Sequence, residues 1–320
     1  MEALFKNNTI WNTAFEIETV DYSLQTRFGK TYHTVTLITA VLVILISILA
    51  VPCNMAVIFF FVRDPLKILR MSPSSYLVFS LACGEFLTTV SINPLAGVGL
   101  VYVSQGEQIP FALSAVLICN EIMRVKSVII LIVLSIDRLI AVLKPLQYKH
   151  IVTVKRTLTV IAAVWVYTIL LGFTLVVLYN MVGVASVLIV AVCHIILASC
   201  TLKLSSVAFL WSLRKQSLIL RKLYNRDGTQ NKHALLRERK VTKGVRIIIF
   251  SFHLLFMPWC CCLVLMFACL RCDINVFAFS LAFLITMVIN FSSSLVHPFL
   301  YAFGLPKFKK TFKHLVKKSN

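Results

Sequence analysis

Seven apolar stretches, each long enough to cross a lipid bilayer, dominate this chain and restrict the folds open to it. A helix needs about 20 mostly apolar residues to cross the hydrocarbon core. The stretches cover residues 34–62, 75–103, 110–143, 157–179, 185–211, 244–270 and 276–302. The composition agrees, because 59% of the 320 residues are hydrophobic and only 14% are charged, whereas soluble domains carry about 25% charged residues. We predict an all-α membrane protein, a bundle of seven transmembrane helices.

The net charge of +20 indicates topology rather than nucleic-acid binding. Most of the 32 Lys and Arg residues lie in the segments that follow the first, third, fifth and seventh stretches. Positive charge gathers on the cytoplasmic side of membrane proteins, so we expect these segments in the cytoplasm and the N-terminus outside. Basic segments also attract the anionic lipids of the inner leaflet. We therefore expect a multi-pass protein of the plasma membrane, with membrane lipids but no nucleic acid among its partners.

This topology divides the chain into an extracellular segment (1–33), a helix bundle (34–303) and a cytoplasmic end (304–320). The first segment lacks the short apolar core of a removable signal peptide. It contains an N-glycosylation sequon at Asn7, on the expected outer side. In the last segment phenylalanines are interleaved with lysines, which predicts a short amphipathic helix on the inner leaflet.

The sequence has no motif typical of an enzyme or of a metal-binding protein. There is no Gly-rich phosphate loop and no nucleophile with a paired base, so we expect no enzymatic activity. Most of the ten cysteines lie within the apolar stretches, where thiols behave as small hydrophobic groups. Cys269 and Cys272 lie near an outer loop, where the oxidising side of the membrane permits a disulfide.

Polar residues inside the apolar stretches mark candidate functional sites, because a charge in mid-bilayer is costly unless it faces partners or water. The second stretch carries Glu85, which we treat as a functional-site residue. The first carries Asn54, for which an interhelical hydrogen bond is an alternative explanation. Pro94 is expected to bend the second stretch, because its ring removes a helical hydrogen bond.

The third stretch is unusually polar in its outer half, where Asn120, Glu121 and Arg124 occur. Glu121 and Arg124 are three residues apart on one helix face and can pair with each other. Alternatively, the group lines an outward-opening pocket that recognises a ligand. Lys126 points away from Arg124 around the helix, and the sequence indicates no partner for it.

Two charges, Asp137 and Arg138, end the third stretch at the cytoplasmic boundary. They either lie in water at a helix end or form a latch between helices. Glu238 introduces the sixth stretch from the same side and offers Arg138 a second carboxylate, which favours the latch. Within the sixth stretch, Pro258 is flanked by bulky aromatic residues, a pattern typical of a hinge or of a static bend.

Six short motifs occur in order along these stretches. They are Asn54; Leu81-Ala82-Cys83-Gly84-Glu85; Asp137-Arg138-Leu139; Trp165; Phe252 to Pro258; and His297-Pro298-Phe299-Leu300-Tyr301. Together they resemble the motifs of rhodopsin-like (class A) G-protein-coupled receptors, and the resemblance covers nearly the whole chain. Leu146-Gln147-Tyr148 and the minimal second outer loop look most like those of melanocortin receptors, within a broad group that includes adenosine, cannabinoid and lysophospholipid receptors.

Several positions depart from the family's pattern. Glu85 stands where the family has aspartate, His297 where it has asparagine, and Phe256 where it has the hinge tryptophan. Leu139 replaces the tyrosine that follows the key arginine, and Leu113 replaces the cysteine of the usual loop disulfide. The acidic cluster with which melanocortin receptors hold calcium and peptide is also missing. The resemblance therefore supports the mechanism better than the ligand.

The resemblance implies a receptor that binds an extracellular ligand in the helix bundle and activates a heterotrimeric G protein as helix six opens. The ligand would be a small molecule, a lipid or a small peptide. The implied residues are ligand contacts (Asn120, Glu121, Arg124, Phe256, Trp259), a coupling switch (Asp137, Arg138, Glu238, Tyr301) and a sodium-like polar site (Asn54, Glu85, Ser127, Ser293, Ser294, His297). Apart from an allosteric sodium ion at Glu85, no cofactor is implied. A protonated His297 in place of sodium is the alternative and would make signalling pH-sensitive.

Two further functions remain open. A transporter or channel would also be helical with charges inside the bilayer, and Glu121 and Arg124 would line its path, although the two halves of the chain show no obvious repeat. A non-signalling receptor-like protein would keep the fold with an altered switch, as Leu139, Phe256 and His297 permit.

Overall fold

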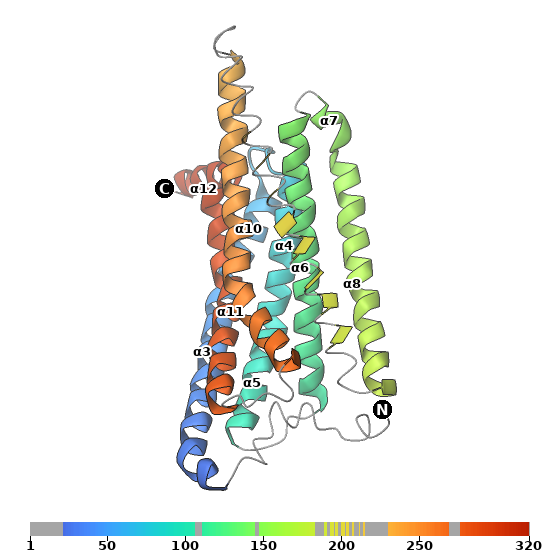
Figure 1. The fold of residues 1–320 in the computed structure, drawn as a ribbon. Coiled ribbons are helices and arrows are strands. Elements are labelled where there is room, and N and C mark those ends of the chain that lie inside the picture. Colours follow the sequence, from blue (N-terminus) through green and yellow to red (C-terminus); the bar gives the residue numbers. More distant parts are fainter. Residues whose placement is uncertain are drawn as a thin grey trace.

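The computed structural model describes residues 22–105, 111–144, 147–182, 230–268 and 276–319, together with scattered positions between 189 and 214. Every regular element in these residues is a helix. The elements are α3 (Tyr22–Arg63), α4 (Pro73–Leu87), η1 (Thr88–Ile92), α5 (Asn93–Ser104), α6 (Phe111–Leu143), α7 (Tyr148–Ile151), α8 (Val154–Val182), α10 (Gln230–Ala268), α11 (Val276–Gly304) and α12 (Pro306–Ser319). The long helices run side by side in an elongated bundle, and α12 projects sideways near one end (Figure 1). The predicted all-α class is confirmed.

Five helical stretches are long and apolar enough to cross a membrane. They are Gly29–Arg63, Pro73–Ser104, Val154–Tyr179, Lys243–Cys262 and Phe277–Ala302. α6 has 33 residues, about 50 Å of helix, but the charges in its outer half make it less apolar. The expected span at 185–211 lies largely outside the described residues, and Asn7, Cys269 and Cys272 lie entirely outside them.

Two helices begin earlier than the hydrophobic pattern predicts. α3 begins at Tyr22 and α10 at Gln230, whereas the apolar stretches start at residues 34 and 244. Both extensions are polar, so a prediction based on apolar runs did not include them. Lys, Arg, Glu and Gln nevertheless form helices well in water. The bundle therefore extends beyond the bilayer, most clearly at the inner end of α10.

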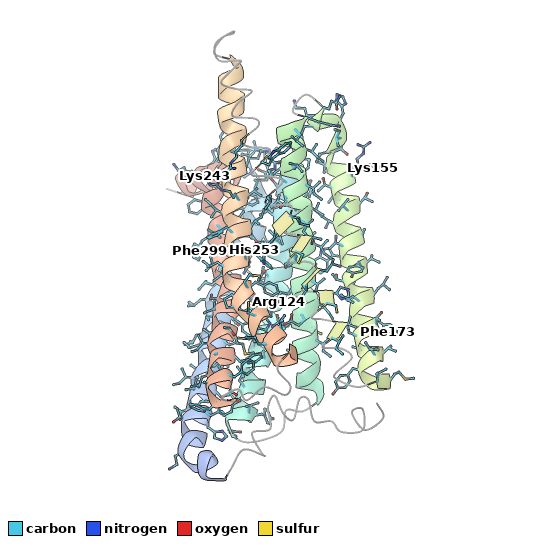
Figure 2. All side chains as sticks on the ribbon, in the orientation of Figure 1. Arg124, Lys155, Phe173, Lys243, His253 and Phe299 are labelled. Carbon is cyan, nitrogen blue, oxygen red and sulfur yellow. The ribbon has the colours of Figure 1, made fainter. Side chains whose placement is uncertain are left out.

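The bundle exposes apolar side chains on its outside and buries polar side chains among the apolar residues of its core. Phe173 of α8 is 72% exposed, and Phe299 of α11 also lies on the outer surface (Figure 2). Asn54 and Asn93, in contrast, are fully buried. Soluble proteins rarely expose broad apolar surfaces, but lipid tails accept them, and polar groups at membrane depth face the bundle interior. The distribution of side chains is that of a multi-pass membrane protein.

The second span contains a π-helical turn, η1, just before Pro94, where the sequence predicted a bend. Pro94 lacks an N–H group, and its ring crowds the carbonyl one turn earlier. A wider turn immediately before the proline relieves this crowding. The Thr89 hydroxyl donates to the Glu85 carbonyl at 2.9 Å, a local hydrogen bond of a kind that bends helices. The turn begins at Thr88, three residues after Glu85, and so sets the direction of α5 relative to that carboxylate.

At the inner end of the bundle, α10 lies against the end of α11 through two glycines. A Cβ atom built on Gly244 would overlap the backbone carbonyl of Gly304. Next to this contact, Phe312 of α12 packs edge-on against Phe60 of α3, with 5.4 Å between the ring centroids. α12 thus occupies the position of the predicted amphipathic helix, and the inner end of α10 is seated closely against its neighbour.

We predict that Gly244→Ala lowers the free energy of unfolding by about 1–3 kcal/mol, the usual cost of overpacking. The overlapping atoms belong to the backbone of α11, so the two helices must move apart. Reversible unfolding in mixed detergent micelles measures the change.

Gly99→Ala is the matched control, because a Cβ atom on Gly99 meets nothing within 4 Å. Its stability should stay unchanged or rise slightly, since alanine forms helices better than glycine. Equal stability of both variants would contradict the close contact between α10 and α11.

Candidate functional site

The charged pair predicted at the inner end of α6 lies in a closed network of buried polar groups. Asp137 and Arg138 are each 4% exposed, and Arg138 Nη2 lies 2.6 Å from Asp137 Oδ2. The Ser74 hydroxyl, at the start of α4, donates to Asp137 Oδ2 at 2.7 Å. The Tyr148 hydroxyl of α7 donates to Asp137 Oδ1 at 2.8 Å. The network joins α4, α6 and α7, and the alternative of a helix end in water is wrong.

Tyr148 is a neutral hydrogen-bond donor in this network. Burial raises the pKa of its phenol well above the ordinary value, and the adjacent Asp137 carboxylate raises this pKa further. The hydroxyl therefore keeps its proton at neutral pH and can donate it to Asp137, while its oxygen accepts a hydrogen bond from Arg138 Nη2 at 2.9 Å. Neither Ser74 nor Tyr148 was predicted as a site residue, because only folding brings their hydroxyls to Asp137 at the end of α6.

A cavity of about 460 Å³ adjoins the network. Arg138 and Tyr148 line it, together with Val245 of α10 and Leu305 at the junction of α11 and α12. The cavity therefore lies among the inner ends of several helices. Glu238 belongs to α10, but its side chain lies outside the described residues. The pairing of Glu238 with Arg138 accordingly stays a prediction.

Halfway along the bundle, the residues predicted for a sodium-like site surround Glu85. The Ser294 hydroxyl donates to Glu85 Oε2 at 2.8 Å, and His297 Nδ1 lies 3.6 Å from Glu85 Oε1. Asn54 Nδ2 donates to the Ser294 carbonyl at 3.0 Å, so Asn54 connects α3 to α11. The His297 ring also stacks on buried Tyr301, with 6.1 Å between the centroids. Tyr301 therefore belongs to the Glu85 cluster by contact.

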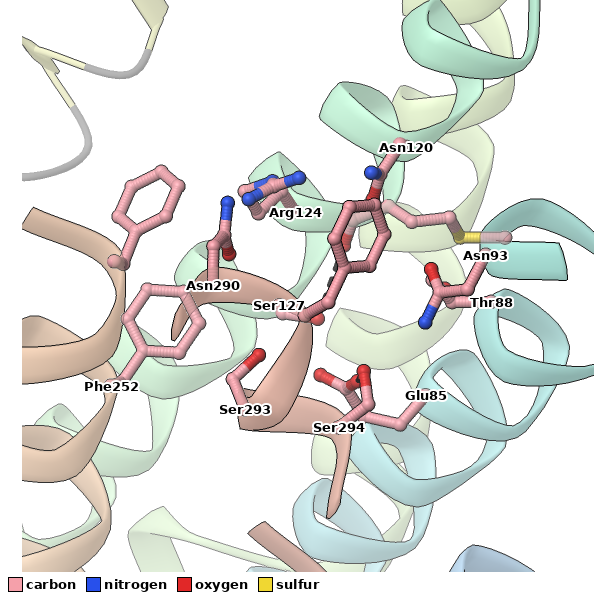
Figure 3. Close-up of a pocket in the computed structure, with 13 residues that line it drawn as sticks. Glu85, Thr88, Asn93, Asn120, Arg124, Ser127, Phe252, Asn290, Ser293 and Ser294 are labelled. Carbon is pink, nitrogen blue, oxygen red and sulfur yellow. Dashed lines mark hydrogen bonds between the residues drawn. The ribbon is translucent and has the colours of Figure 1, made fainter. Parts of the chain in front are cut away.

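A small cavity of about 30 Å³ extends from Glu85 toward the outer half of α6. Ser127 and Ser293 line it near Glu85, and Asn120 and Arg124 line it farther out (Figure 3). A single water molecule takes up about this volume in the liquid. In this conformation the cavity has room for a water molecule or a small ion, but not for a whole ligand.

In the outer half of α6, Arg124 contacts an acid and two aromatic rings. Its Nη2 atom lies 3.4 Å from Glu121 Oε1. Its Cζ atom lies 5.5 Å from the centroid of the Phe256 ring and 5.8 Å from that of Trp259, both within the range of a cation–π attraction. The ion pair predicted from the spacing is thus present, while Arg124 also lines the cavity. These contacts connect α6 to the part of α10 around Pro258.

Lys126 is a buried charge whose surroundings the sequence did not indicate. The side chain is 0% exposed. Its Nζ atom donates to the Ser80 carbonyl at 3.4 Å and lies 4.8 Å from the centroid of the Trp165 ring. A Cβ atom on Gly84 would overlap this ammonium, so glycine at that position makes room for it. The partners lie on α4 and α8, and no spacing along α6 could identify them.

Comparison with known proteins identifies the family. The model of the 7 transmembrane receptor (rhodopsin family) matches residues 53–301. Melanocortin receptor 5 of Mus musculus is 23% identical over 258 residues, which are 77% of this chain and 74% of the relative. Melanocortin receptor 4 of Danio rerio is 24% identical over 256 residues (76% and 74%), and melanopsin of Podarcis siculus is 22% identical over 300 residues (86% and 60%).

These matches confirm the resemblance inferred from the motifs, and with it the seven-helix bundle and the absence of an enzymatic role in this family of signalling receptors. The described helices supply five of the spans by length and composition, and α6 carries the arginine motif at its inner end. The chain belongs to the rhodopsin family of seven-transmembrane receptors.

Proposed function

We propose that this plasma-membrane receptor binds an extracellular ligand among the outer halves of its helices and activates a heterotrimeric G protein when the inner end of α10 swings outward. The N-terminus lies outside the cell, and the inner ends of α6 and α10 face the cytoplasm. One observation carries the proposal. The buried network around Asp137 and Arg138 adjoins a cavity of about 460 Å³ that reaches Val245 of α10.

The network favours the closed state because its charges are satisfied inside the bundle. Asp137 accepts hydrogen bonds from Arg138, Ser74 and Tyr148. Pulling Arg138 out of this arrangement would leave a buried carboxylate with fewer donors, which is strongly unfavourable. A ligand that binds the open state more tightly shifts the population toward that state, and a differential affinity of a few kcal/mol is enough to do so.

α10 connects the two ends of the molecule. Its outer part contacts Arg124 through Phe256 and Trp259, and its inner part packs against α11 at Gly244. Pro258 lies within the helix and frees a backbone carbonyl, which makes a pivot there less costly. A displacement at the aromatic rings therefore moves the inner end of α10 away from the cavity.

A receptor-like protein that does not signal is the second candidate. It has support from His297 and Phe256, which stand where the family has asparagine and tryptophan. The transporter or channel alternative is not supported, because the chain belongs to a family of receptors. G-protein activation by the purified chain separates the two remaining candidates.

We predict that Glu238→Ala raises basal G-protein activation. If the pair with Arg138 is worth about 1 kcal/mol, its loss increases the open population, and with it the basal rate, by roughly fivefold. Nucleotide exchange is measured with the purified receptor in lipid nanodiscs and a panel of purified heterotrimers.

Two variants serve as controls for this experiment. Glu238→Gln removes the charge while keeping the size of the side chain, and should behave like Glu238→Ala. Lys243→Ala removes an exposed charge from the same helix and should leave the rate unchanged. An unaltered basal rate in both Glu238 variants, at equal receptor concentration, would exclude the latch.

The Glu85 cluster also suits a sodium ion. Hard cations take oxygen ligands, and the oxygens of Glu85, Ser127, Ser293 and Ser294 line one cavity of about 30 Å³. Asn54 would support this set through its hydrogen bond to the Ser294 carbonyl. The ion would supply positive charge to the carboxylate and so stabilise the closed bundle.

We predict that sodium chloride raises the midpoint of thermal unfolding relative to N-methylglucamine chloride at equal ionic strength. The difference should vanish in Glu85→Gln, which lacks the carboxylate charge. Identical midpoints of the original chain in the two salts would contradict a sodium site at Glu85.

A further inference from the structure

Arg124 retains hydrogen-bonding capacity that the described residues do not use. Its side chain is 10% exposed, yet its Nε and Nη1 atoms have no hydrogen-bond partner among these residues. A buried donor without a partner costs free energy, and more so when it is charged. The guanidinium lines the cavity in the bundle (Figure 3). Because this cavity of about 30 Å³ does not hold a whole ligand, an acceptor on a ligand reaches the guanidinium only in a wider arrangement of the helices.

Glu121 shows the complementary property beside Arg124. Its Oε2 atom is buried and lacks a hydrogen-bond partner among the described residues, while Oε1 lies 3.4 Å from Arg124 Nη2. Neighbouring donors add to the group, since Asn290 Nδ2 and Trp259 Nε1 are also buried without partners there. The outer half of the bundle thus presents a cation and an anion side by side, each with an unused hydrogen-bonding atom.

The charges of the interior restrict what can bind. Glu121 offsets Arg124, and Glu85 lies beside His297 with Lys126 nearby on α6. A ligand with a net charge would leave that charge uncompensated in a medium of low dielectric constant, at a large desolvation cost. A ligand that carries both charges adds none to the total.

We infer that the ligand carries a zwitterionic head group, with a carboxylate that pairs with Arg124 and an ammonium that pairs with Glu121. This inference rests on the proposed receptor function and specifies its ligand. The two side chains touch at 3.4 Å, so the two charges must be close together, as they are in an α-amino acid. The rings of Phe256 and Trp259 flank Arg124 and favour an apolar or aromatic side chain on the ligand.

The same contacts explain how such a ligand would act on α10. Arg124 lies against the rings of Phe256 and Trp259, the residues on either side of Met257 and Pro258. A carboxylate competes with the ring faces for the guanidinium, because a charge-assisted hydrogen bond is stronger than a cation–π contact. Binding therefore loosens the hold of α6 on α10 at the pivot.

The test compares three probes with the same side chain: L-phenylalanine, which carries both charges, L-phenylalaninamide, which lacks the carboxylate, and N-acetyl-L-phenylalanine, which lacks the ammonium group. The midpoint of thermal unfolding of the purified receptor in nanodiscs is followed against probe concentration. We expect a saturable rise with L-phenylalanine and roughly tenfold or greater loss of apparent affinity when either charge is removed. No rise with L-phenylalanine, or an equal rise with N-acetyl-L-phenylalanine, overturns the inference, the latter in favour of a purely anionic ligand.

Variants of Arg124 and Glu121 test whether these residues cause the thermal shift with L-phenylalanine. Arg124→Gln and Glu121→Gln should abolish the effect of L-phenylalanine, whereas Arg124→Lys, which keeps the charge, should weaken it and retain the preference for the zwitterion. Lys203→Gln removes an exposed charge from the expected fifth span and should respond like the original chain. An undiminished response in folded Arg124→Gln overturns the assignment to Arg124. The comparison of probes uses only the original chain and so decides the inference even where a variant does not fold.

Basal nucleotide exchange, measured on the same preparations, distinguishes this inference from the proposed function. Exchange that responds to Glu238→Ala, together with no response to any zwitterionic probe, retains the receptor and removes the zwitterionic ligand. Failure of exchange with every heterotrimer removes the proposed function, and a saturable shift with L-phenylalanine would still establish the binding site.

Discussion

The structure depends on the pairing of charges that a bilayer would otherwise exclude. Four helical turns of α6 separate Arg124 from Arg138, and each guanidinium has a carboxylate beside it, Glu121 in one case and Asp137 in the other. Ionic groups at membrane depth are costly alone, so their partners fix the helices that supply them. The pair at the inner end is fully engaged by hydrogen bonds, whereas the outer pair keeps unused atoms. In the proposed function, the inner pair holds the bundle closed and the outer pair receives the ligand.

In the proposed mechanism, α10 connects the outer charged pair to the inner cavity. It meets the outer pair with the rings of Phe256 and Trp259, which flank Pro258, and it meets the inner cavity with Val245. The close approach of Gly244 to Gly304 shows that the inner end of α10 contacts the backbone of α11 directly, without flexible side chains between them. Closely packed contacts have low compressibility, so this contact resists small displacements of the inner end of α10. The proposed mechanism therefore needs only the movement of α10 and a charged network around Asp137 and Arg138 that favours the closed position.

Much of this architecture could be predicted from the sequence, and the features that could not have two physical causes. Apolar runs located the spans, and the spacing of Glu121 and Arg124 predicted their pairing, because both signals are local. Lys126 and Tyr148 acquire their roles from residues on other helices, and a linear pattern carries no information on such contacts. The π-helical turn before Pro94 was missed for a different reason, since a proline requires relief of crowding but does not specify whether a bend or a wider turn provides it.

We propose that the Asp137 carboxylate helps to hold α10 in its closed position through Arg138, which lines the same cavity as Val245 of α10. This proposal is tested most directly by the distance between the inner ends of α8 and α10, measured by double electron–electron resonance between spin labels at Lys155→Cys and Lys243→Cys. Both positions are exposed (Figure 2), and the exposed native cysteines are replaced by serine. Asp137→Asn removes the charge that pairs with Arg138, so we expect more receptors with a long distance between the two spin labels. A distribution identical to that of the parent receptor would contradict it.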